Sequence, residues 1–138
     1  MSEANRSIFQ HFLDEVVERG NLSVIEDVVS PQFLNHDPRL PHLPPDLEGE
    51  KRFFAELHAS FENLEVQVQE FRAFQDVVVC RSSWSGVHVG GFAGLPHTRR
   101  RVSLEVVDVL RFREGFLTER WGLLDYWHLL NQLKGEHT

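Results

Sequence analysis

The chain has 138 residues, of which 41% are hydrophobic and 25% charged, and its formal net charge is −7. This length and composition predict one domain over residues 1–138 with a core of its own, and they exclude a disordered chain. The acidic balance argues against nucleic acid as a partner, because the one basic cluster, Arg99 to Arg101, is too short to reverse it.

The cysteine content and the N-terminal residues bear on the compartment. The single cysteine, Cys80, excludes an internal disulfide framework and favours a reducing cytoplasm. The start, MSEANRS, is not a basic-then-apolar signal peptide, and no apolar run approaches the roughly 20 residues that span a bilayer. We therefore expect a soluble cytoplasmic protein without membrane contacts, acting on a small molecule or on another protein.

Three helices are predicted in the first half of the chain. Apolar residues recur with a period of 3.6 from Ile8 to Val17, and Gly20 stands where such a helix ends. A short helix is predicted over residues 22–29, and a third begins at Asp46, a favoured N-cap, and runs to about residue 62. The segment FLNHDPRLPHLPPDLEG before this third helix contains four prolines, which is typical of a lid or a pocket wall.

After residue 63 the period of the apolar residues changes from 3.6 to 2, which predicts strands. The predicted strands cover residues 64–71, 76–89, 100–112 and 116–125, and a short helix closes the chain over residues 126–135. A glycine-rich connection, GGFAGLPHTR, separates the second and third of these strands, and a short strand is also expected before LNHDP. Helices followed by an antiparallel meander predict an α+β fold with helices on one face of a curved sheet.

Alternation along the strands places polar and aromatic side chains on otherwise apolar faces. In the strand 100–112 the even-numbered positions are apolar except Asp108, and in the last strand Leu117, Trp121, Leu123 and Asp125 share a side. The side chains assigned to inward faces include Trp84, His88, Asp108, Trp121 and Asp125. A buried carboxylate must pair, raise its pKa or meet water, and a raised pKa suits a general acid or base.

Each polar candidate has a structural interpretation beside the catalytic one. Asp125 either caps the closing helix or serves as an acid/base at a strand end. Asp108 is more typical of a paired structural carboxylate than of a catalytic one. His36 either lines a pocket or hydrogen bonds within a turn, and His88 is more typical of a structural residue. Asp37, before a proline, is typical of an Asx-turn.

The spacing of the histidines does not favour a metal site. His36, Asp37, His42 and His58 lack the helical or cysteine-rich spacing of metal ligands, so no metal is predicted. Trp84 and Trp121 are typical of core residues and also of ligand platforms.

The chain resembles the SnoaL-like polyketide (ester) cyclases of the NTF2-like superfamily. The matching segments cover nearly the whole chain: VVERGNLSVIEDVVSPQFLNHDP, GEKRFFAELHASFENLEVQV, WSGVHVGGFAGLPHTRRRVS, VDVLRFREGFLTERWGLLD and LLNQL. The resemblance implies a cone-shaped α+β barrel, in which a curved antiparallel sheet wraps around N-terminal helices and encloses a deep pocket. It also implies homodimers or higher oligomers.

The same resemblance implies an intramolecular aldol ring closure that needs no metal or organic cofactor. We therefore expect cofactor-independent proton abstraction next to a carbonyl group of a small hydrophobic substrate. Asp125 takes the position of the acid/base, with His36 and His88 as catalytic candidates in the pocket. The expected substrate-binding residues are Trp84, Phe92, Asp108 and Trp121.

One residue departs from the family pattern. Arg120 stands before Trp121 where the family often has a histidine, and an arginine does not titrate near neutral pH. By strand parity Arg120 faces away from Asp125. Two alternatives remain open: an epoxide hydrolase or isomerase in which Asp108 and Asp125 share one cavity, and a non-catalytic module for ligand binding or dimerisation.

Overall fold

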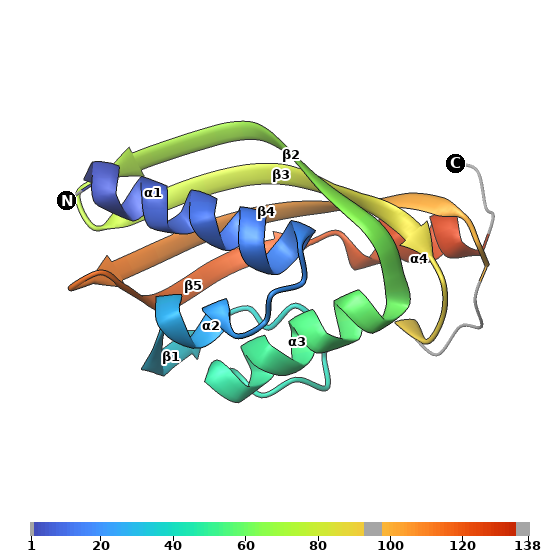
Figure 1. Cartoon of the computed structure of the whole chain (residues 1–138), viewed down its shortest axis with the longest axis horizontal. Helices are drawn as coiled ribbons and strands as arrows, with labels where there is room; N and C mark the ends of the chain where they lie inside the picture. The colour runs from blue at the N-terminus through green and yellow to red at the C-terminus, as the bar shows by residue number, and fades with distance from the viewer. Residues whose placement is uncertain (1, 93–97, 135–138) are drawn as a thin grey trace.

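A computed structural model describes residues 2–92 and 98–134, and Figure 1 shows how their helices and strands are arranged. Residues 93–97 of the predicted glycine-rich connection lie outside the described residues. The elements in chain order are α1 (Ser2–Phe12), the π-helical segment η1 (Leu13–Glu18), α2 (Val24–Val28), β1 (Val29–Asn35), α3 (Leu47–Ser60), β2 (Phe61–Phe74), β3 (Val77–His88), β4 (Arg101–Arg113), β5 (Phe116–Leu124) and α4 (Tyr126–Leu133).

The five strands form one sheet in the order β1-β5-β4-β3-β2. The strands β2 to β5 pair antiparallel in chain order, as the period-2 pattern predicts, whereas β1 joins the edge parallel to β5. Figure 1 shows α1 and α3 over the same face of the strongly curved sheet. The predicted α+β architecture, a curved sheet around N-terminal helices, is confirmed, and the parallel edge strand β1 makes the sheet mixed.

The two predicted helix boundaries of the first half have the expected causes. The buried residues of α1 and η1 follow the predicted 3.6-residue period, and the chain then turns at Gly20, whose φ is +72°. At the start of α3, Asp46 accepts a hydrogen bond from the Gly49 backbone N–H at 3.1 Å, which satisfies one of the free donors of the first turn. In the part of the chain that the structure describes, no helix is long and apolar enough to cross a membrane.

A β-bulge in β5 changes which side chains face the interior. Arg111 of β4 pairs with Glu119, whereas the next residue, Phe112, pairs with Leu117, so β5 contains one extra residue at Thr118. Because side chains alternate with a period of 2, the extra residue reverses the parity beyond it. Arg120 is consequently buried, and Leu123 is 62% exposed.

The predicted shared face of Leu117, Trp121, Leu123 and Asp125 is therefore wrong, and the bulge is the physical reason. Beyond Leu117 the inward positions of β5 are those of Arg120, Gly122 and Leu124, which pair with the inward positions of β4. Strand parity assigns faces correctly only as far as the ladder is regular.

The left-handed backbone at Gly20 generates a stability prediction. A Cβ at this position also comes within 3.1 Å of His58 Nδ1, so we expect Gly20→Ala to lower the free energy of unfolding by about 1–2 kcal/mol. Gly20→Asn is the control, because asparagine adopts positive φ more readily and should cost less. Urea denaturation measures both, and equal stability of all three proteins would contradict the explanation.

Candidate active site

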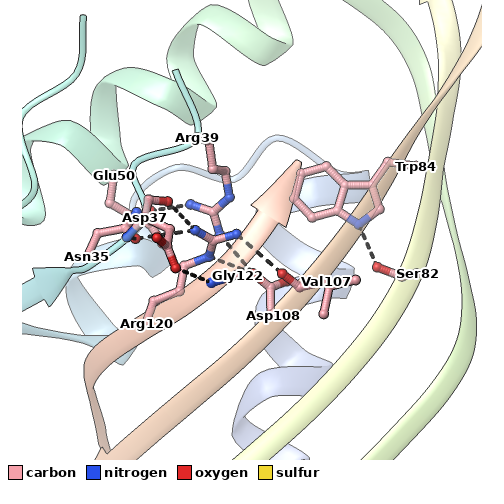
Figure 2. Close-up of polar contacts among 10 residues, drawn as sticks. All are labelled: Asn35, Asp37, Arg39, Glu50, Ser82, Trp84, Val107, Asp108, Arg120 and Gly122. Carbon is pink, nitrogen blue, oxygen red and sulfur yellow. Dashed lines mark hydrogen bonds and ion pairs between the residues drawn. The ribbon is translucent and has the colours of Figure 1, made fainter. Parts of the chain in front are cut away.

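A cluster of four charged side chains lies under the helices on the inner face of the sheet (Figure 2). Asp108 of β4 and Arg120 of β5 face it from the sheet, Glu50 from the first turns of α3, and Arg39 from the proline-rich segment between β1 and α3. We call these four residues the interior cluster. None of their side chains is more than 3% exposed. The cluster combines two guanidinium groups with two carboxylates, so its charges balance.

The arginines connect the two carboxylates into a chain. Arg120 Nε donates to Asp108 Oδ1 at 2.6 Å, and Arg39 Nη2 lies 3.4 Å from the same oxygen. Arg39 Nη1 donates to Glu50 Oε1 at 2.5 Å. Arg39 therefore bridges Glu50 and Asp108, and Asp108 Oδ1 is shared between two cations. Such charge-assisted contacts are required here, because burial of an unpaired charge is strongly destabilising.

Arg120 also binds the segment that follows β1. Its Nη1 donates to the Asp37 carbonyl oxygen at 2.6 Å and to Asn35 Oδ1 at 3.2 Å. The guanidinium passes close over Gly122, where a Cβ would lie 2.7 Å from Arg120 Nη2 and 2.1 Å from the Val107 carbonyl oxygen. Glycine at 122 is therefore required first by the Val107 carbonyl oxygen and then by the space that Arg120 occupies.

The surroundings shift the pKa values of both arginines. Burial acts to lower the pKa of Arg39, but the carboxylates of Glu50 and Asp108 outweigh it and leave the pKa raised. Burial, followed by repulsion from Arg39, lowers the pKa of Arg120 despite its pairing with Asp108. Since an arginine side chain starts from a pKa above about 12, both remain cations near neutral pH.

Three buried atoms of the interior cluster have no hydrogen-bond partner among the described residues. They are the donor Arg39 Nε and the acceptors Glu50 Oε2 and Asp108 Oδ2. Buried polar atoms normally find partners, so these three atoms have hydrogen-bonding capacity that the described residues leave unused. The cluster thus offers a proton acceptor and a hydrogen-bond donor within one desolvated group of side chains.

Aromatic rings flank the interior cluster. The Arg39 guanidinium lies 5.1 Å from the centre of the Phe53 ring and 5.3 Å from that of Phe54. Both rings pack against Trp84, whose Nε1 donates to Ser82 Oγ at 3.0 Å. Figure 2 shows Trp84 beside the cluster, so the predicted inward position of Trp84 is confirmed.

His88 lies at the other end of the inner face. Asp108 pairs with Cys80 on β3, and His88 is eight residues farther along that strand, roughly 25 Å away at 3.3 Å per residue. His88 Nδ1 accepts the Thr98 backbone N–H at 3.3 Å, which places the proton of the neutral ring on Nε2. Its ring packs near Phe61, which contacts Phe92. The inward position of His88 is confirmed and Phe92 is buried beside it, but both are remote from Asp108, and substrate binding by Phe92 stays a prediction.

Asp125 is the N-cap of α4 and its side chain is exposed. Its Oδ1 accepts the His128 backbone N–H at 3.0 Å. The capping interpretation is therefore confirmed, whereas a role of Asp125 as acid/base stays a prediction. Because Asp125 is exposed and Asp108 is fully buried, the two carboxylates do not share an interior cavity, which removes the geometric basis of the epoxide hydrolase alternative.

His36 and Trp121 lie together on the outer face of the sheet. Their rings stack with centres 4.5 Å apart, and His36 Nε2 lies 2.9 Å from Glu119 Oε2. The hydrogen bond from His36 is the largest cause that lowers the pKa of Glu119. The Arg111 guanidinium covers Trp121 at 5.4 Å. The predicted inward position of Trp121 is wrong, because the bulge turns it outward.

The histidines considered for a metal site have separate partners. His42 Nε2 lies 3.0 Å from Glu56 Oε2, and His58 Nε2 lies 2.7 Å from the Val16 carbonyl oxygen. The described residues contain no group of three or more potential ligands. The Asx-turn predicted for Asp37 belongs instead to Asn35, whose Oδ1 accepts the Asp37 N–H at 3.1 Å.

Sequence reasoning missed Arg39 and Glu50. Glu50 carried a signal, because it occupies the position of an apolar stripe that continues through Phe53, Phe54 and Leu57. A charged residue in such a stripe needs a buried partner. Arg39 carried no such signal, since it lies in a segment without periodic structure.

Comparisons with known proteins agree with this architecture. The family model described as SnoaL-like polyketide cyclase matches residues 7–133. Similar solved structures include TsrD from Streptomyces laurentii, with 22% identity, 95% of each chain covered and a TM-score of 0.83. IdmH from Streptomyces antibioticus is 26% identical, with 94% of this chain and 98% of that chain covered and a TM-score of 0.76. The search of curated proteins found no match.

The buried ion pair generates a second stability prediction. Arg120→Met leaves Asp108 with one cation, Arg39 at 3.4 Å, in place of two, so we expect it to lower the free energy of unfolding by about 3–5 kcal/mol. The matched control is Arg101→Met, because Arg101 and its partner Glu65 are 56% and 72% exposed and their pair should contribute about 1 kcal/mol or less. Urea denaturation measures both changes, and similar losses for the two variants would contradict a structural role of the interior cluster.

Proposed function

The chain belongs to the SnoaL-like polyketide cyclase family, and we propose that it is a cofactor-independent enzyme that removes a proton next to a carbonyl group of a small hydrophobic substrate. Ring closure by an intramolecular aldol reaction is the expected consequence, because the resulting enolate attacks a second carbonyl carbon of the same molecule. The proposal places the chemistry at the interior cluster, with Asp108 as the base.

One observation carries this proposal. The interior cluster contains an acceptor, Asp108 Oδ2, and a donor, Arg39 Nε, and neither has a hydrogen-bond partner among the described residues. Enolisation needs these two functions together, a base for the carbon-bound proton and a donor for the oxygen that becomes negative. Phe53, Phe54 and Trp84 supply the apolar wall that a hydrophobic ring system would contact.

Charge balance favours the reaction at this site. When Asp108 takes the proton, the carbon–hydrogen bond breaks and its electron pair forms the carbon–carbon double bond of the enolate, while the π pair of the carbonyl group moves onto its oxygen. One negative charge leaves the carboxylate and one appears on the enolate oxygen, next to the cationic Arg39. The number of charges in the desolvated site is unchanged, and fixed guanidinium groups stabilise the new anion better than reorienting water.

A pair of carboxamide variants separates Asp108 from Asp125. We expect Asp108→Asn to abolish exchange of the α-hydrogens of 2-tetralone in D2O, followed by NMR, because an amide does not take up the proton. We expect Asp125→Asn to retain exchange and to lose at most about 1 kcal/mol of stability, as a cap substitution does.

Circular dichroism shows whether each variant is folded, and Glu50→Gln provides a second change within the cluster should Asp108→Asn fail to fold. Loss of exchange in Asp125→Asn with full exchange in Asp108→Asn would overturn the assignment and favour Asp125 as the acid/base. The absence of exchange in the unmodified protein would favour the non-catalytic alternative.

We also propose that the outer face of the sheet binds a second copy of the chain. Val79, Val109 and Trp121 are register partners across β3, β4 and β5, and Val107 pairs with Leu123 in the next rung. These side chains form an apolar stripe on the outer face, in which Leu123 is 62% exposed. A partly exposed apolar stripe across three strands, with Val79 and Leu123 as its exposed members, is typical of an interface, and the family resemblance implies dimers through the sheet.

The stripe generates a prediction about oligomeric state. Leu123→Asp places a charge at the most exposed residue of the stripe, and we expect it to shift a dimer to monomer in analytical ultracentrifugation. Phe74→Asp is the control, because Phe74 is 73% exposed at the β2–β3 hairpin end, outside the stripe, and should leave the mass unchanged. A monomer in the unmodified protein, or an unchanged dimer in Leu123→Asp, would contradict this interface.

A further inference from the structure

We propose that residues 36–44 form a flap that opens to admit substrate and, on closing, brings Arg39 into the interior cluster. The inference rests on the proposed function for the identity of the site, and it assigns the route by which a substrate reaches that site. It also makes Arg39 the residue whose position depends on closure, whereas Asp108, Glu50 and Arg120 stand on regular elements.

The flap is a compact loop with a closed neck. At the neck, the Asn35 backbone N–H donates to the Pro45 carbonyl oxygen at 2.9 Å, so the two ends of the loop lie side by side. Within the loop, the Leu43 N–H donates to the Leu40 carbonyl oxygen at 3.2 Å. Three prolines, at 38, 41 and 44, restrict the backbone between these bonds. A short loop with closed ends and a stiff backbone moves as a unit about its neck.

Side-chain contacts and single hydrogen bonds, not a strand ladder, hold the flap against the rest of the molecule. The Asp37 carbonyl oxygen accepts from Arg120 Nη1 at 2.6 Å, and His36 pairs with Glu119 and stacks on Trp121. On its inner side Leu40 and Leu43 are buried, and Arg39 makes the ion pairs with Glu50 and Asp108. At its outer tip His42 pairs with Glu56 of α3, where both side chains are largely exposed.

At its base the flap binds the edge of β5. The His36 N–H donates to the Arg120 carbonyl oxygen at 2.8 Å, and the Gly122 N–H donates to Asp37 Oδ2 at 2.9 Å. The flap lacks the continuous backbone ladder that fixes β3 and β4. Opening it therefore breaks separate hydrogen bonds and ion pairs but no continuous backbone ladder, which is typical of a locally opening segment.

The burial of Asp108 explains why the flap has to open and close. With the flap closed, the side chain of Asp108 is only 1% exposed, so a substrate reaches Asp108 Oδ2 only when a wall moves. The flap is the wall that carries the donor Arg39 Nε. Opening removes the donor and admits the substrate, and closing completes the pair of base and donor and excludes water from the enolate.

Amide hydrogen exchange measured residue by residue by NMR tests the opening directly. The N–H groups of His36 and Gly122 report on the flap, since the hydrogen bond of each joins the flap to β5. We expect them to exchange through an opening whose rate is nearly independent of low urea concentrations, whereas the amides of β3 and β4 exchange with the urea dependence of global unfolding. Equal rates and equal urea dependence for both sets would overturn the inference.

Variants shift the opening in both directions. Leu43→Ala removes an inner contact of the flap, so we expect exchange at Gly122 to become about tenfold faster without an equal change in β3 and β4. Leu34→Ala, at a 42% exposed position of β1, is the matched control and should leave that rate unchanged. A uniform acceleration over the whole chain in Leu43→Ala would show that Leu43 serves only global stability and would overturn the flap.

A cross-link at the tip tests the role in turnover. In the double variant His42→Cys/Glu56→Cys, a short bis-maleimide joins the flap to α3, and burial raises the pKa of Cys80 to about 12, so that thiol stays unreactive. We expect the cross-linked protein to lose exchange of the 2-tetralone α-hydrogens at least about tenfold relative to the unlinked double variant. Equal turnover before and after cross-linking would overturn the gate. If the flap amides exchange through local opening but the unmodified protein never catalyses exchange of the 2-tetralone α-hydrogens, the gate stands and the proposed chemistry fails.

Discussion

The buried ion pair between Asp108 and Arg120 joins parts of the chain that are far apart in sequence. Asp108 belongs to β4 and Arg120 to β5, and the same guanidinium holds Asn35 and the Asp37 carbonyl at the end of β1. Each of these charges would be strongly destabilising if it were buried without its partner. The strands β4 and β5 and the segment after β1 are therefore stable only in the arrangement that pairs the charges. Arg39 is the second cation of the cluster, and its ion pair with Glu50 joins a second carboxylate to the cluster.

The position of Arg120 gives the departure from the family pattern a physical meaning. A histidine at this position exchanges protons near neutral pH, whereas an arginine holds its proton and acts as a fixed charge. In the proposed mechanism the Asp108 carboxylate on β4 therefore takes the proton, and the arginines stabilise the anion that forms. Gly122 contributes to the placement of Arg120, since a larger residue at position 122 would occupy the space of the guanidinium.

Much of the fold was predictable because its causes are local. The change of the apolar period near residue 63 located the transition from helix to strand, and Asp46 and Gly20 marked helix ends through capping and positive φ. The bulge at Thr118 was not predictable, because no glycine or proline marks it and it arises from pairing with β4. That single residue reversed the expected faces of Trp121 and Arg120.

The candidate site was predictable in part, because the faces of regular strands follow from local alternation. Asp108 and Trp84 were placed correctly, since both lie on regular strands. Arg39 was invisible to periodicity, because its position depends on a loop folding back onto charges from three other elements. Residues of this kind become visible only when the tertiary partners of a loop are known.

A crystal structure with 2-naphthol tests the central claim most directly, because this planar enol mimics the product of proton abstraction. We expect the ring against Phe53 and Trp84, the hydroxyl oxygen within hydrogen-bond distance of Arg39 Nε, and the carbon next to the hydroxyl-bearing carbon facing Asp108 Oδ2. An ordered 2-naphthol bound beside Asp125 or His88, with the interior cluster unchanged, would contradict it.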